Sequence, residues 1–199
     1  MLRIKEAKTV ISTTLYLGLR MYHIELSDTG TEIKTEDLAM SAATYGYVSI
    51  DGDRNLKQMI DIADLCKQIQ KNNPETKIFL TTFGTARPSG INIVKNMEHI
   101  VRIKPTSEQE VLEASIDEKV WKWLEKAGAK FIFTVFDKND IDNINLVCAA
   151  LVMNKHQFFF RINSPNFKEL AVYTISLGFN ICMEMDDVNL EDTDGIESY

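Results

Sequence analysis

A short run of charged and small residues follows a predicted strand at residues 47–50. Asp51, Gly52, Asp53 and Arg54 come directly after the apolar end of this strand. Carboxylates in such a position can bind a cation or the amino group of a ligand. The other interpretation is a polar turn in which an Asp or Asn side chain caps the next helix. These four residues form the first part of a candidate ligand site.

A second candidate segment, residues 82–90, combines glycines with hydroxyl side chains. Thr82, Gly84, Thr85 and Arg87 lie within it, directly after another predicted strand. The backbone amides of such a loop can cradle a phosphate or a carboxylate, although the lysine of a P-loop is missing. A flexible loop without a ligand is the alternative. We expect Thr82, Gly84 and Thr85 to contact the ligand.

Two basic residues, Lys104 and Arg161, stand at or just beyond the ends of further predicted strands. Side chains at these positions would point into the mouth of a barrel and favour an anionic ligand. A structural ion pair is the competing explanation. The sequence has no Gly-x-Ser-x-Gly elbow and no Gly-x-Gly-x-x-Gly motif after a strand. Hydrolases and dinucleotide-dependent enzymes are therefore disfavoured.

The elements that must position these residues are predicted from hydrophobic periodicity. Short apolar runs rich in β-branched and aromatic residues indicate strands, and apolar residues at helical spacing indicate helices. Thr35 is the expected N-cap of the first helix. The expected strands are 10–17, 47–50, 77–81, 99–103, 130–136, 157–162 and 180–183, and the expected helices are 35–45, 56–72, 117–127, 137–154 and 167–177.

This alternation of strands and helices predicts an α/β protein. Repeated βα units form a mostly parallel sheet with right-handed crossovers, and we expect a partial (β/α)6 barrel. In parallel α/β architectures the ligand site lies at the carboxyl ends of the strands, where the βα loops come together. The candidate residues named above lie in or beside those loops.

Three features follow one another along the chain in an order that is typical of one family. They are a strand that ends at Gly18, the Gly-acid pair Gly52-Asp53, and Thr-Phe-Gly-Thr at 82–85. This order resembles the small radical S-adenosylmethionine enzymes, particularly 7-carboxy-7-deazaguanine synthase and the anaerobic ribonucleotide reductase activases. In that family Gly-Gly-Glu-Pro contacts the methionyl amino group, and Thr-Asn-Gly-Thr follows the third strand. The resemblance covers nearly the whole body of the chain.

The ligands of the family's iron–sulfur cluster are missing from this sequence. The first loop of the family reads Gly-Cys-x-x-x-Cys-x-x-Cys, and its three thiolates hold a [4Fe–4S] cluster. Counted from Gly18, the three cysteine positions are occupied here by Leu19, His23 and Leu26. Leucine has no donor atom, so we expect no cluster, no cofactor and no radical chemistry. If the resemblance holds, the chain is a degenerate member of the family.

The segment around His23 also has a plainer interpretation. Apolar residues alternate from Leu15 to Met21, which allows the first strand to continue to about Leu26 and to turn at 28–30. The strand would then pack where a cluster loop would have been. The histidines of the chain lack the close spacing of zinc ligands, and we expect no metal site.

The three cysteines, Cys66, Cys148 and Cys182, are expected inside two helices and a strand, where they cannot replace the missing ligands. A free thiol among apolar neighbours is usually a small core residue. The odd number of cysteines and the absence of a secretory signal indicate a reducing, cytoplasmic environment. No stretch of the sequence is long and apolar enough to cross a bilayer, so no membrane contact is expected.

The net charge of −7 comes from the C-terminal end of the chain. The sequence has 22 Lys and Arg residues against 29 Asp and Glu residues, and seven of the acids but none of the bases lie from Glu184 to Tyr199. A charge-balanced body argues against a protein that binds nucleic acid by neutralising phosphates. We expect one α/β domain at 1–185 and an acidic C-terminal tail at 186–199.

The leading functional hypothesis is a non-catalytic radical-SAM-like scaffold. It would bind a protein partner, a second copy of the chain or a small anionic ligand. Either Trp121 or Trp123 is expected to be exposed for such a contact, and the acidic tail could supply another.

The alternative hypothesis is a small α/β enzyme that acts on a nucleotide or sugar phosphate with a divalent cation. This enzyme would use four charged side chains near the strand ends: Asp51, Asp53, Lys104 and Arg161.

Overall fold

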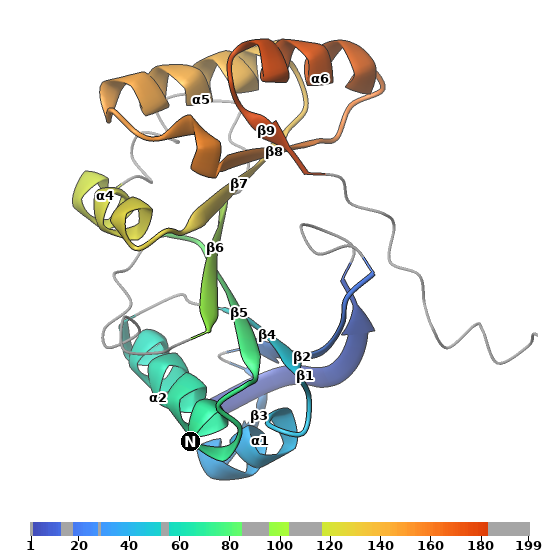
Figure 1. Ribbon diagram of the computed structural model, residues 1–199, viewed down its shortest axis with the longest axis vertical. Helices are drawn as coiled ribbons and strands as arrows, with labels where there is room; N and C mark the ends of the chain where they lie inside the picture. Colours follow the sequence, from blue (N-terminus) through green and yellow to red (C-terminus); the bar gives the residue numbers. More distant parts are fainter. Residues whose placement is uncertain are drawn as a thin grey trace, which may run out of the picture.

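The computed structural model describes residues 2–12, 18–27, 29–52, 56–84, 96–103 and 117–182. Strands and α-helices alternate through these ranges (Figure 1). None of the helices found there is both long and apolar enough to span a membrane. The elements are β1 (Leu2–Ile11), β2 (Arg20–Leu26), β3 (Thr31–Ile33), α1 (Thr35–Ala42), β4 (Tyr47–Asp51), α2 (Leu56–Asn72), β5 (Lys77–Thr82), β6 (Met97–Ile103), α4 (Glu118–Lys126), β7 (Lys130–Val135), α5 (Lys138–Ala150), β8 (Phe158–Ile162), α6 (Phe167–Ser176) and β9 (Asn180–Ile181).

The strands form one sheet in the order β3-β1-β2-β4-β5-β6-β7-β8-β9. β1 runs antiparallel to both β2 and β3, and the pairs from β2–β4 to β8–β9 are parallel. The predicted α/β fold with a mostly parallel sheet is thereby confirmed. Each new parallel strand is added on the same side of the previous one, so right-handed crossovers place their helices on one face. Figure 1 shows the strands following an arc with the helices on its outer side.

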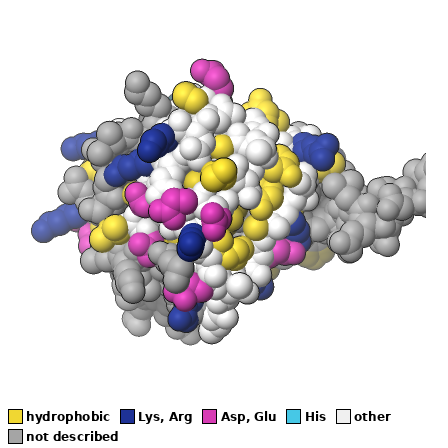
Figure 2. Space-filling model, turned by 90° about the horizontal axis from the view of Figure 1, so that it is seen from below, with side chains coloured by type: hydrophobic (Ala, Val, Ile, Leu, Met, Phe, Trp, Pro, Cys, Tyr) yellow, Lys and Arg dark blue, Asp and Glu magenta, His cyan; other side chains and the backbone are white. Residues whose placement is uncertain are grey.

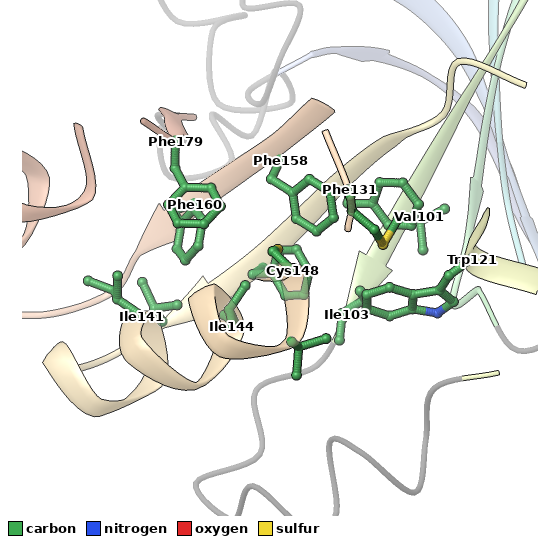
Figure 3. Close-up of a cluster of buried hydrophobic side chains, with 14 of the residues drawn as sticks. Val101, Ile103, Trp121, Phe131, Ile141, Ile144, Cys148, Phe158, Phe160 and Phe179 are labelled. Atoms are coloured by element: carbon green, nitrogen blue, oxygen red, sulfur yellow. The ribbon is translucent and has the colours of Figure 1, made fainter. Parts of the chain in front are cut away.

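The larger hydrophobic core lies between the helices and the C-terminal half of the sheet. Phe131 and Phe158, from neighbouring strands, stack with their ring centroids 4.9 Å apart, and Phe160 meets Phe179 at 4.7 Å. Trp121 of α4 packs against Phe131 at 5.3 Å. Figure 3 shows this cluster with Ile141, Ile144 and Cys148 of α5 beside it. The apolar periodicity that predicted these elements therefore marks the residues that form the core.

A second core lies between helices α1 and α2 and the N-terminal half of the sheet. Ile24, Val48 and Ile78 are completely buried there. Cys66 of α2 is part of the same cluster, and burial raises the pKa of its thiol to about 12. The expected role of this cysteine as a small core residue is confirmed.

The surface seen from below in Figure 2 mixes acidic and hydrophobic side chains. Helix α1 lies at this end of the molecule, and it exposes Glu36, Asp37 and Met40. Isolated exposed hydrophobic side chains are normal on globular proteins. They do not by themselves mark an interface.

Side-chain caps begin α4 and α5, where the sequence places an aspartate before each helix. Asp117 accepts hydrogen bonds from the backbone amides of Lys119 and Val120, and Asp137 accepts one from the amide of Asp140. The expected N-cap at Thr35 is wrong. Lys34 occupies that position without a side-chain cap, and Thr35 is a buried residue of the first helical turn.

The N-terminal strand differs most from the sequence prediction. The expected strand at 10–17 lies mostly outside the described residues, and β1, which ends at Ile11, pairs with β2 as an antiparallel hairpin. The backbone amide of Ser12 donates to the carbonyl of Leu19 at 2.8 Å and closes the paired region. The alternative interpretation placed the end of a strand at Leu26 correctly, although that strand begins only at Arg20. Charged residues in β1 hide the alternation of its core residues, Leu2 and Ile4.

We expect Gly84→Ala to destabilise the fold more than Gly128→Ala. Both glycines have a positive φ, +70° and +81°, which costs an L-residue about 1 kcal/mol. A Cβ at Gly84 would also lie 2.7 Å from Cγ1 of Val101, whereas no described atom comes within 4 Å of one at Gly128. Overpacking of this kind adds about 1–3 kcal/mol. Urea denaturation of the two variants measures the difference, and equal losses would contradict this account of Gly84.

Candidate functional site

The face of the sheet opposite the helices, here called the inner face, holds the candidate site. Successive side chains of a strand point to opposite faces, so residues that alternate with the core positions lie here. The inner-face residues of the parallel strands are Met21, His23 and Glu25 of β2, Tyr47, Ser49 and Asp51 of β4, Lys77, Phe79 and Thr81 of β5, Glu98, Ile100 and Arg102 of β6, Lys130, Ile132 and Thr134 of β7, and Phe159 and Arg161 of β8.

Paired charges occupy the inner face at the amino ends of three neighbouring strands. Glu98 lies between Lys77, whose Nζ is 3.5 Å from Oε2, and Lys130, which contacts Oε1. The Glu98 side chain is only 17% exposed, so these lysines offset the cost of burying its carboxylate. Both ammonium groups also lie over aromatic rings, that of Lys77 over Phe79 and that of Lys130 over Phe159. This end of the inner face is therefore closed by satisfied charges.

Apolar side chains fill the middle of the inner face. Met21, Phe79, Ile100 and Ile132 are buried and form one cluster with Cys182, which follows β9. Phe159 packs against it from β8. The cluster separates the paired charges at the amino ends from a second group of polar side chains at the carboxyl ends.

This second group, here called the upper tier, consists of Asp51, Thr81, Arg102, Thr134 and Arg161. Strand pairing aligns Asp51 with Thr81, and Thr134 with Arg161. Oδ2 of Asp51 is 3.9 Å from a guanidinium nitrogen of Arg102, across the intervening strand β5. The Glu25 carboxylate is bound by Lys5 at 2.9 Å. The upper tier lies where parallel α/β proteins bind their ligands.

The charges of two arginines act on the thiol of Cys182. Burial raises the pKa of this thiol to about 11, while Arg161 and, to a smaller extent, Arg102 act to lower it. In a flat sheet, strands β6 and β9 would be separated by three strand spacings, about 14 Å. Both arginines act on the same thiol because the sheet curves around the inner face, as Figure 1 shows. The upper tier therefore carries two positive charges on the inner face of the sheet.

The predicted site residues fall into three groups. Asp51 and Arg161 lie in the upper tier as expected, and Gly52 follows Asp51 with its amide donating to the carbonyl of Thr81 at 3.1 Å. Thr82 and Gly84 serve the core instead: the Thr82 hydroxyl is 2.7 Å from Nε2 of buried His99, and Gly84 packs against Val101. The remaining predictions lie outside the described residues: Asp53, Arg54, Thr85 and Lys104.

Arg102 is the site residue that sequence reasoning missed. It stands between Val101 and Ile103, which both face the helices, so its side chain must face the other way. That alternation was visible in the sequence. The prediction instead selected Lys104, two positions further along the sequence and outside the described residues.

The structure also changes the interpretation of the degenerate cluster motif. His23 and Leu26 lie on β2 rather than in a loop, and Leu19 directly precedes that strand. His23 Nδ1 is 2.8 Å from the hydroxyl of Ser49 on β4. A motif counted from Gly18 therefore does not describe a loop that could surround a cluster.

The sulfur and metal chemistry of the described part of the chain is limited. Cys148 is buried in α5, and burial raises the pKa of its thiol to about 12. In the described ranges no group of three or more His, Cys, Asp or Glu side chains is arranged to hold a metal ion. Of the two tryptophans one was expected to pack inward, as Trp121 does, but the expected exposure of the other is wrong, because Trp123 packs partly buried against both cores.

The fold and site define an α/β protein whose inner face carries an arginine-containing tier at the carboxyl ends of its strands. No protein-family model matches the sequence, and no curated protein is significantly similar to it. The geometry of the upper tier is therefore the basis for inferring function.

We expect the buried His99 to make the fold sensitive to acid. Burial lowers its pKa from 6.5 to about 4, so the stability that neutral His99 contributes is present above pH 6.5 and is lost as the pH falls towards 4. Between pH 7 and pH 5 this loss amounts to about 2 kcal/mol. Urea denaturation of wild type and His99→Gln at both pH values isolates the effect from that of other titrating groups. Parallel losses in the two proteins would contradict it.

Proposed function

We propose that the chain is a non-catalytic radical-SAM-like scaffold that binds a small anionic ligand at the upper tier. The sequential order of the parallel strands and the placement of the helices on the outer side of the arc support a partial (β/α)6 barrel. The order of Gly52 and of Thr-Phe-Gly-Thr at 82–85 after successive strands supports the relationship to the radical enzymes.

The cysteines argue against radical chemistry in this scaffold. An iron–sulfur cluster needs several thiolate ligands close together. The sequence has no cysteine between β2 and α1, and Cys66 and Cys148 are buried on separate helices. These positions support a scaffold without an iron–sulfur cluster.

The main observation behind this proposal is that the Arg102 guanidinium is only weakly paired. Its ion pair with Asp51 at 3.9 Å is longer than a hydrogen bond, and the side chain is 41% exposed. Among the described residues no hydrogen-bond acceptor for its five N–H groups is found. A guanidinium matches the two oxygens of a carboxylate or phosphate in a bidentate arrangement. Arg161 adds a second positive charge to the upper tier.

The same geometry favours this proposal over the alternatives. In an enzyme that uses a divalent cation, Asp51 would be expected among the metal ligands, but its carboxylate faces Arg102. A protein partner that docks through an exposed tryptophan is disfavoured, since Trp123 packs against both cores.

We expect small oxyanions to stabilise the protein through Arg102. The probes are benzoate and phenyl phosphate, and a ligand at 100 times its Kd adds about 2.7 kcal/mol, or about 5–10 °C in Tm. Thermal melts with and without each probe measure the shift. Arg102→Gln should lose it, while the control Lys122→Gln, on an exposed face of α4, should keep it. Failure of both probes to shift wild type, or an unchanged shift in Arg102→Gln, would overturn the proposal.

We also expect the chain to take up no stable cluster. After anaerobic reconstitution with iron and sulfide followed by gel filtration, iron analysis should find well below one cluster per chain. A brown protein that retains four irons and cleaves S-adenosylmethionine would show that the scaffold is catalytic.

A further inference from the structure

The ion pair between Asp51 and Arg102 joins two strands that are not neighbours. β5 lies between β4 and β6, and the pair can form because the intervening residue, Thr81, is small and buried. Asp51 is 28% exposed and Arg102 is 41% exposed. Partly exposed ion pairs without a hydrogen bond are weak, so a better-placed anion can replace the carboxylate.

Asp51 is the inner-face acid whose charge acts on the proposed ligand. Glu25, its neighbour on β2, is bound by Lys5 at 2.9 Å. Glu98 is held between two lysines at the opposite end of the strands. The carboxylate of Asp51 faces the guanidinium of Arg102 in the upper tier.

We propose that Asp51 sets the charge selectivity of this site and makes it prefer singly charged carboxylates to doubly charged phosphates. This inference rests on the proposed anion-binding function. Asp51 competes with the ligand for Arg102, and it stays beside the bound ligand because it is fixed to β4. Its repulsion therefore grows with each negative charge that the ligand carries.

The inference predicts opposite behaviour for two charge-removing variants. Asp51→Asn keeps the size of the side chain but removes the charge beside Arg102. Glu25→Gln, the matched control, removes one charge from the adjacent strand at the register position next to Asp51. Because Lys5 already neutralises Glu25, the control should leave the selectivity unchanged.

The test compares the affinities of benzoate and phenyl phosphate at pH 7.5, where the phosphate carries two charges because its second pKa is about 6. NMR titration of wild type, Asp51→Asn and Glu25→Gln gives the Kd ratio of the two probes for each protein. We expect wild type to bind benzoate more tightly, and Asp51→Asn to shift the ratio towards phenyl phosphate by about tenfold. Glu25→Gln should shift it less than about twofold.

The outcomes separate this inference from the proposal beneath it. If wild type binds the probes but Asp51→Asn leaves the ratio unchanged, or Glu25→Gln shifts it equally, the inference is wrong and anion binding stands. If neither probe binds wild type or Asp51→Asn, both proposals fail. Thermal melts of each variant without ligand confirm that the fold is intact.

Discussion

The direction in which strands are added to the sheet determines the rest of this structure. From β2 onwards every parallel strand joins the growing edge, so right-handed crossovers bring their helices to the same face. The described helices and the sheet bury the two large hydrophobic cores between them, and none of these helices covers the other face. The residues of that inner face must satisfy one another or a ligand.

The charged side chains of the inner face are partly removed from water, and their pairing differs between the two ends of the strands. At the amino ends of the strands, Glu98 has two lysines close to it, and both lysines also lie over aromatic rings. At the carboxyl ends the one described partner of the Arg102 side chain is the carboxylate of Asp51, 3.9 Å away. Because partly buried charges are costly unless they are paired, this difference marks the carboxyl ends as the place where an anion adds most stability.

Sequence reasoning predicted the parallel part of the fold well and the N-terminal hairpin poorly, for physical reasons. Helix α2 was predicted with its observed bounds and strand β7 to within one residue, because both bury a continuous apolar pattern. β1 pairs near one edge of the sheet and alternates core residues with Lys5 and Glu6, so its pattern is weak. For its partner β2 the sequence left two interpretations open, a loop at the family's cluster position and a strand that ends near Leu26, and the structure shows a strand.

The sequence predicted those site residues whose position depends only on the local pattern of one strand. Asp51 and Arg161 lie at strand ends and on the inner face, as their positions in the sequence indicated. The role of Thr82 depends on His99, a residue of the neighbouring strand, and such a contact is not visible in local sequence. Arg102 could have been found from strand alternation alone.

The central claim is that the upper tier binds an anion through its arginines, and the most direct measurement is an NMR titration of the arginine Nε–Hε resonances with benzoate. The account predicts that the resonances of Arg102 and Arg161 move together and give a single Kd, while that of Arg3, on the exposed side of β1, does not move. Equal movement of Arg3 and Arg102, or no movement of Arg102 at saturating benzoate, would contradict it.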